Sequence, residues 1–162
     1  MPVPASIAAA AAEFHTNTGF LERVTSGIEP GQWLSRPHAN SNHIAWIAGH
    51  LVWARQALIG RLGGEWAHPG LEIFARSAKI DSSVVYPSPE ALLAAWREAA
   101  GVLDKAMETV SDAALDAPAP PGPPSPNGKL SGMVGVLAWH ETYHLGQIAY
   151  LRSWLGCPGI FG

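Results

Sequence analysis

Hydrophobic residues recur at three-to-four spacing in four separate segments of the chain. In the first, residues 4–26, one stripe contains Ile7, Ala11, Phe14, Thr18 and Leu21. This spacing places side chains on one face of an α-helix. The sequence Glu-Pro-Gly at 29–31 then interrupts the pattern. We therefore predict a first amphipathic helix over residues 4–26.

Two further helices are predicted in the middle of the chain. The first of them follows the polar cluster Asn40-Ser41-Asn42, which offers candidate N-caps, and ends at the glycine pair 63–64. Its inward stripe comprises His43, Ile47, His50, Leu51, Ala54 and Leu58. Residues 64–87 have no clear period, and we expect a structured loop. The next helix opens with Ser88 as N-cap and Pro89 at the first helical position. Its apolar face comprises Leu92, Trp96, Leu103 and Met107.

The fourth periodic segment follows a stretch that cannot be helical. Six of the ten residues from 117 to 126 are proline, which lacks a backbone donor, so we expect a stiff, extended connection. The fourth helix is predicted over residues 130–155, ending at Gly156. Its inward stripe comprises Met133, Leu137, His140, His144, Ile148 and Leu151. Together the segments predict an all-α fold: a four-helix bundle with a long connection between helices two and three and a Pro-rich connection between helices three and four.

Composition indicates one globular domain, residues 1–162, with enough chain for its own core. The net charge is −3 and the lysines and arginines are scattered, so no basic stripe favours nucleic acid. The sequence contains no uninterrupted apolar run of about 18 residues, so we expect no membrane span. The Ala-rich N-terminus has no basic segment, which favours a helix over a signal peptide. A single cysteine, Cys157, cannot form an internal disulfide and suits a reducing cytoplasm, where we expect the protein.

The fourth segment carries the pattern H-E-x-x-H at His140, Glu141 and His144, which zinc peptidases place on a helix. Histidines four residues apart share a helix face, so both can reach one metal ion. A histidine on a core stripe is also commonly a hydrogen-bonded core residue, and the spacing alone allows both interpretations. Two ligands are too few for a tight site, so a metal centre needs a third.

The third ligand has to come from upstream. The eighteen residues after His144 contain no His, Asp or Glu, and Cys157 lies beyond the predicted helix. The second helix offers His43 and His50, seven residues and about 10 Å apart along the axis. We favour His50, because it lies mid-helix at the depth of His140 and His144, whereas a first-turn histidine more often has a local or solvent-facing role.

The stretches HIAWIAGHLVWAR and WHETYHLGQIAYLR resemble the DinB/YfiT-like superfamily. The resemblance implies a four-helix bundle with a long connection and three metal-binding histidines, which fall on His50, His140 and His144. It also implies nickel or zinc as the divalent ion, a homodimer, and in some members transfer of a low-molecular-weight thiol such as bacillithiol, mycothiol or glutathione. Many members have no established activity, so the resemblance does not decide function.

Three imidazoles leave a metal at least one open coordination position, as in catalytic sites. Water bound there becomes hydroxide near neutral pH, and a bound thiol is deprotonated. Glu141 could act as a general base, orient a ligand, or be a solvated or inter-helix carboxylate. Gln147 lies near the inward stripe and could face the site, and Tyr143 could pack or meet a partner chain. Cys157 is expected to be an incidental residue near the tail.

Small and aromatic residues add two expectations. Gly49, next to His50, would let another helix or a ligand approach closely. Four tryptophans could line an apolar pocket over the metal, could be ordinary core residues, or could be buried against a second subunit. These are Trp46, Trp53, Trp139 and Trp154.

The leading functional interpretation is a metal-dependent transferase acting on a low-molecular-weight thiol and a small electrophile. One alternative is a metal-dependent hydrolase that uses Glu141 as its base. The other is a module that binds a metal or a small ligand without turnover, for example in a stress response.

Overall fold

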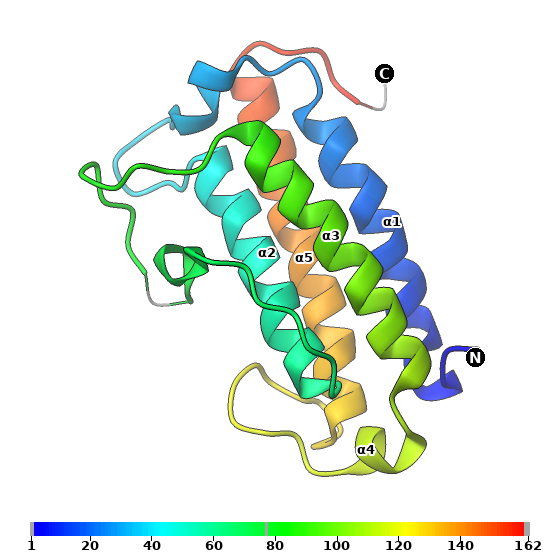
Figure 1. Ribbon diagram of the computed structural model, residues 1–162. Coiled ribbons are helices and arrows are strands. Elements are labelled where there is room, and N and C mark those ends of the chain that lie inside the picture. Colours follow the sequence, from blue (N-terminus) through cyan, green and yellow to red (C-terminus); the bar gives the residue numbers. More distant parts are fainter. Residues whose placement is uncertain (1, 77, 161–162) are drawn as a thin grey trace.

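The computed structural model describes residues 2–76 and 78–160, and their regular elements are helical. Four long helices lie side by side (Figure 1): α1 (Ala8–Thr25), α2 (Ile44–Arg61), α3 (Pro89–Thr109) and α5 (Leu130–Trp154). The connections contain shorter pieces: the 3₁₀ helices η1 (Ala5–Ile7), η2 (Pro30–Leu34) and η3 (Leu71–Phe74), and the one-turn helix α4 (Asp112–Asp116). The predicted all-α helical bundle is confirmed. Among the described residues, no helix combines the length and hydropathy that crossing a membrane requires.

The chain direction explains why one connection is long. Helices α1 and α5 run one way along the bundle, and α2 and α3 run the other way (Figure 1). Because α2 and α3 are parallel, the connection 62–88 has to return along the bundle before α3 can begin. Each of α1 and α2 packs against both α3 and α5, which closes the bundle.

The apolar core divides into two clusters, separated by a polar layer in the middle of the bundle. Leu51 of α2 and Leu145 of α5 belong to one cluster, and Leu58 and Leu137 of the same helices belong to the other. The helices pass from one cluster to the next over one to two turns, and buried polar side chains lie within that interval or, for His50, next to Leu51 at its edge. They are Asn17, His50, Arg55, Glu141 and His144. The candidate site lies in this layer.

The predicted N-cap of α3 and the glycines after α2 and α5 agree with the structure, whereas the predicted N-cap of α2 does not. Ser88 caps α3 by accepting a hydrogen bond from the backbone of Ala91, and Gly63 and Gly156 have positive φ beyond the ends of α2 and α5. The N-cap of α2 is His43, not the predicted cluster at 40–42. Its imidazole Nδ1 accepts from the backbone N–H of Trp46 at 3.0 Å, the role more often taken by Asn or Ser.

The sequence pattern also missed two smaller features. The first helix begins as a 3₁₀ turn, η1, before α1. Helix α4, which precedes the Pro-rich connection, is capped by Ser111 and buries Leu115. The connection itself is extended enough for Pro118 to form an isolated antiparallel bridge with Lys129.

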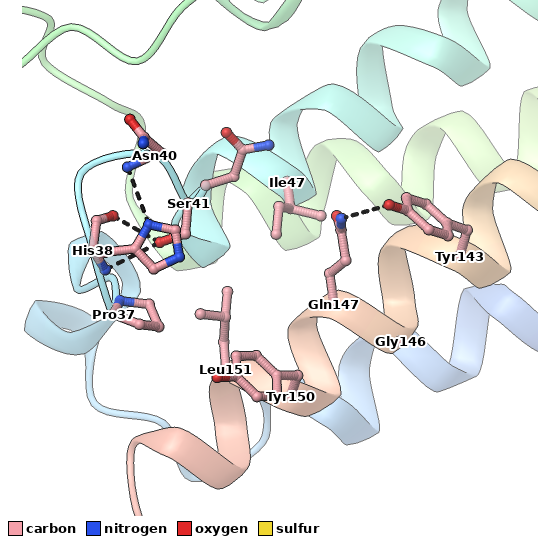
Figure 2. Close-up of a pocket in the computed structure, with 11 residues that line it drawn as sticks. Pro37, His38, Asn40, Ser41, Ile47, Tyr143, Gly146, Gln147, Tyr150 and Leu151 are labelled. Carbon is pink, nitrogen blue, oxygen red and sulfur yellow. Dashed lines mark hydrogen bonds between the residues drawn. The ribbon is translucent and has the colours of Figure 1, made fainter.

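A cavity of about 500 Å³ lies between the loop before α2 and the C-terminal half of α5 (Figure 2). His38 and Ser41 line it from the loop, and Gln147 and Tyr150 line it from α5. Gln147 connects this cavity to the histidine cluster.

Candidate metal centre

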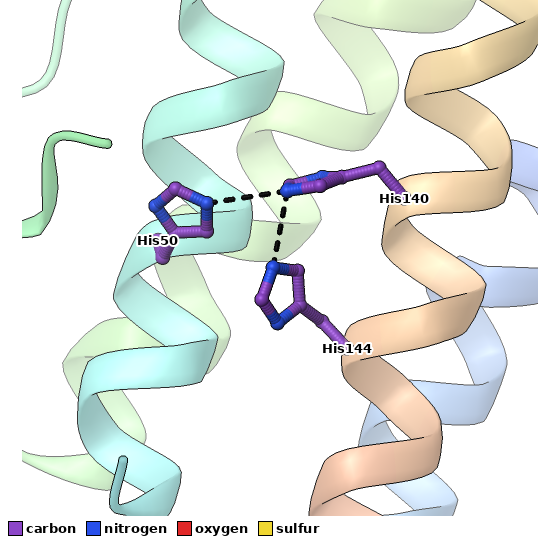
Figure 3. A group of neighbouring side chains, drawn as sticks. All are labelled: His50, His140 and His144. Carbon is purple, nitrogen blue, oxygen red and sulfur yellow. Dashed lines mark hydrogen bonds between the residues drawn. The ribbon is translucent and has the colours of Figure 1, made fainter. Parts of the chain in front are cut away.

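His50 of α2 and His140 and His144 of α5 point toward one another between the two helices (Figure 3). Nε2 of His140 lies 3.3 Å from Nε2 of His50 and 3.0 Å from Nε2 of His144. One ligand atom from each residue lies within 4.8 Å of the others. Two imidazole nitrogens bound to one tetrahedral ion, each at about 2.0–2.1 Å, would be about 3.3 Å apart. The three side chains could therefore hold a metal ion without large movement.

Hydrogen bonds at Nδ1 of His50 and of His144 determine which ring nitrogen of each residue carries the proton. Nδ1 of His50 lies 2.7 Å from the carbonyl oxygen of Phe74, and Nδ1 of His144 lies 2.7 Å from Oε1 of Gln147. Both oxygens only accept, so both Nδ1 atoms carry the proton and both Nε2 atoms present a lone pair to His140. Nε2 of His140 can donate at most one hydrogen at a time. A cation among the three nitrogens would satisfy every lone pair, so the donor set fits a metal.

Burial keeps these imidazoles neutral. It lowers the pKa of His140 and of His144 to about 4, and it lowers the pKa of His50 as well. Electrostatic interactions with His144, His50 and Arg76 lower the pKa of His140 further. Neutral imidazole is the form that ligates a metal, so protons do not compete for the site at pH 7.

The anchor of His50 depends on how closely η3 packs against α2. A Cβ at Gly49 would overlap the aromatic ring of Phe74, so only glycine lets η3 approach this closely. The approach brings the Phe74 carbonyl to His50. The expectation that Gly49 permits a close neighbour is confirmed, and that neighbour is η3. Phe74 was not predicted as part of the site, because a backbone carbonyl leaves no side-chain pattern in the sequence.

The anchor of His144 extends to the surface. Nε2 of Gln147 donates to the hydroxyl of Tyr143 at 3.2 Å (Figure 2), and Gln147 accepts from His144. Gln147 therefore faces the histidine cluster, one of the orientations that the helical stripe allowed. Nδ1 of His140 is buried and has no hydrogen-bond partner among the described residues.

Three of the four flagged tryptophans surround the cluster. Trp46 and Trp53 stack on the His50 ring with centroid distances of 5.0 and 5.5 Å. Trp53 also lines a cavity of about 280 Å³ beside His50 and His140, together with Trp139. Trp154 is in the last turn of α5 and 44% exposed, so it is neither a core residue nor part of this cavity lining.

Glu141 is buried in an ion pair with α2. Its two carboxylate oxygens accept from Nε and Nη2 of Arg55 at 2.7 and 2.9 Å, and both residues are 1% exposed. The Arg55 guanidinium lies 3.4 Å from the centroid of the Trp96 ring. Burial raises the pKa of the Glu141 carboxyl, and the charge of Arg55 opposes that rise. Of the roles considered for Glu141, the geometry favours the inter-helix carboxylate.

The other candidate residues lie outside the cluster. His43 is 3% exposed, caps α2 and meets the Tyr86 ring edge-on at 4.7 Å, so its role is local but not solvent-facing. Burial and the charge of Arg36 lower the pKa of His43 to about 4. Cys157 is a free thiol, partly buried against the apolar cluster, and is not one of the grouped ligands.

The comparison with known proteins agrees with this geometry. Residues 13–148 match the family model of the DinB superfamily, and this span contains His50, His140 and His144. No curated protein matches the chain. The family match covers well over half of the sequence. The chain therefore belongs to the DinB superfamily.

Proposed function

We propose that the protein is a metal-dependent transferase that joins a low-molecular-weight thiol to a small electrophile. The observation that carries the proposal is the convergence of three Nε2 atoms, from His50, His140 and His144, whose spacing fits one ion. Membership of the DinB superfamily supports it. Nickel and zinc are the ions we propose, since imidazole nitrogen suits both.

Each residue around the cluster has a distinct task in this proposal. The three histidines hold the ion, while the Phe74 carbonyl and Gln147 fix the orientation and tautomer of His50 and His144. When bound, the ion supplies the positive charge that converts a neighbouring thiol to a thiolate. Trp53 and Trp139 line the adjacent cavity with aromatic surface. Glu141 is not required as a base, because Arg55 already engages both of its oxygens.

The test is thiol consumption by the purified protein, with and without added nickel or zinc. Glutathione, bacillithiol and mycothiol would each be mixed with monobromobimane as a general electrophile. We expect at least one thiol to react faster than the protein-free background only when metal is present, and the His144→Ala variant to lose this rate. No rate above background for any thiol would contradict the proposal. Thermal stabilisation by a thiol without product would favour the non-catalytic binding module instead.

We also propose that the protein is a homodimer that uses the outward face of α5. Four aromatic residues at helical spacing are exposed there: Trp139, Tyr143, Tyr150 and Trp154. Aromatic residues of this kind are enriched in protein interfaces. Light scattering should give twice the chain mass of 17.1 kDa, and a Tyr150→Ser, Trp154→Ser double variant should give the monomer. A monomeric wild-type protein at high micromolar concentration would refute the dimer.

A further inference from the structure

The residues that line the cavity beside His50 and His140 indicate which kind of ligand it could bind. Its volume is about 280 Å³, which suits a small molecule. Besides the two histidines, most lining residues are apolar, and Trp53 and Trp139 offer ring surfaces. The only charged lining residues are Arg61 and Arg76, and no carboxylate lines the cavity within the described ranges.

Neither arginine forms an ion pair with another residue that the structure describes. In residues 2–76 and 78–160, the ion pairs that form involve Arg55, Arg97 and Lys129, not Arg61 or Arg76. Arg61 donates from Nη1 to the carbonyl of Ala57 at 3.0 Å, which leaves its other N–H groups available. The whole chain has a net charge of −3, whereas the charged side chains that line this cavity are both positive. Such a local field attracts anions.

The Pro-rich connection lies beside Arg61 at the cavity wall. Gly122, Pro123 and Pro124 line the cavity together with Arg61. A Cβ at Gly122 would come within 2.9 Å of Nη2, and the φ of Gly122 is 148°, a conformation that other residues rarely adopt. Glycine at this position therefore leaves room for the guanidinium beside a stiff backbone.

We propose that this cavity binds a small organic anion, with its carboxylate or phosphate held by Arg61 and Arg76 and its apolar body against Trp53 and Trp139. Guanidinium groups recognise both oxyanions through paired N–H donors. The anion then lies beside the histidine cluster, since His50 and His140 form part of the same wall. This inference rests on the proposed function and deepens it, because it makes one of the two transferase substrates an anion with an apolar body.

The test is a titration of the chelator-treated, metal-free protein with benzoate, phenyl phosphate and the neutral isostere benzamide, followed by NMR shifts of the tryptophan indole N–H signals. We expect benzoate or phenyl phosphate to bind, and benzamide to bind at least about tenfold more weakly. The stronger of the two anions identifies the preferred oxyanion. Equal affinities for the anions and benzamide, or no binding of any of them, would overturn the inference.

Substitutions assign the effect to the two arginines. Arg76→Gln should weaken anion binding about ten- to a hundredfold, and it should fold normally because Arg76 is exposed and makes no ion pair with a described residue. Arg61→Gln should do the same. Arg97→Gln removes the same charge at a residue that does not line the cavity, in an exposed pair with Glu22, and should leave the affinity unchanged. Unchanged binding in Arg76→Gln, or an equal loss in Arg97→Gln, would contradict the inference.

This experiment separates the inference from the proposed transferase activity. The titration contains neither metal nor thiol, so anion binding can succeed where thiol transfer fails. Conversely, metal-dependent thiol transfer to a neutral electrophile, without binding of benzoate or phenyl phosphate, would leave the proposed function standing and remove the anion site.

Discussion

The two buried histidines of α2 show how position on a helix decides the use of a side chain. His43, at the N-cap, accepts a hydrogen bond from the backbone N–H of Trp46 at its Nδ1. His50, two turns later, has a protonated Nδ1 anchored on Phe74 and directs its Nε2 lone pair into the cluster. The same residue type therefore serves as a cap in one place and as a candidate ligand in the other.

The cap makes His43 a source of acid sensitivity. The pKa of His43 is about 4 in the folded chain, against about 6.5 when unfolded, so only the unfolded chain binds this proton between those values. This contribution to the free energy of unfolding should therefore fall as pH drops from about 6.5 to about 4, and stay constant above. Urea unfolding of the metal-free protein at pH 7 and pH 5 measures it.

His43→Asn is the matched variant, because Asn keeps a cap acceptor but does not titrate. The other histidines contribute equally to both proteins. The variant should lose less stability than the wild type between pH 7 and pH 5. An identical loss in the two proteins would mean that His43 does not titrate as the buried cap requires.

Glu141 should matter for stability and not for metal binding. Glu141→Gln leaves the Arg55 charge buried without its partner, which should lower the free energy of unfolding by about 3 kcal/mol. Glu22→Gln breaks an exposed pair with Arg97 and should cost at most about 1 kcal/mol. Denaturant titrations compare the two variants, and metal analysis should give wild-type content for both. Equal stability losses, or loss of metal in Glu141→Gln, would count against the structural role.

At the scale of elements, the contact between η3 and α2 controls the site. Gly49→Ala places a methyl group where the Phe74 ring packs, which should displace η3 and remove the carbonyl that orients His50. We expect metal affinity to fall about ten- to a hundredfold, as for other residues that orient ligands. Competition with a chromophoric chelator measures the affinity.

Gly60→Ala is the control for this substitution. Gly60 lies on the same helix, and a Cβ there meets nothing within 4 Å. This variant should keep wild-type metal affinity and gain a little stability from the higher helix propensity of Ala. If Gly49→Ala binds metal as tightly as Gly60→Ala, the Phe74 carbonyl is not needed to orient His50.

The long helices could be predicted because each has a periodic apolar stripe bounded by glycine or proline. The same stripes placed His50, His140 and His144 on inward faces, so sequence reasoning alone identified these three as candidate ligands. Burial was underestimated on α2, where all residues from Ile44 to Val52 are buried, because a helix covered on several sides has no single stripe.

What the sequence pattern could not predict depends on contacts between distant segments. The Phe74 anchor comes from a backbone carbonyl in a region without period. Glu141 of α5 pairs with Arg55 of α2, and Arg55 lies outside the predicted stripe of α2. The pattern H-E-x-x-H is typical of zinc peptidases and indicates Glu141 as a candidate base. Packing in the bundle instead makes Glu141 the ion-pair partner of Arg55.

At the scale of the whole molecule, the bundle places buried polar side chains between two apolar clusters. The histidine cluster and the Arg55–Glu141 pair both lie in the layer between these clusters. The ion pair joins α2 to α5 at the depth where the histidines meet. The fold thus fixes the relative position of the two helices that supply all three candidate ligands.

The central claim is that His50, His140 and His144 form one metal site, and elemental analysis tests it most directly. Wild-type protein reconstituted with nickel or zinc and then desalted should retain about one ion per chain. Single Ala substitutions of the three histidines should each abolish most of that content, while His43→Asn should retain it. Loss of metal from His43→Asn as large as that from His50→Ala, or a wild-type protein that retains no ion, would contradict the account.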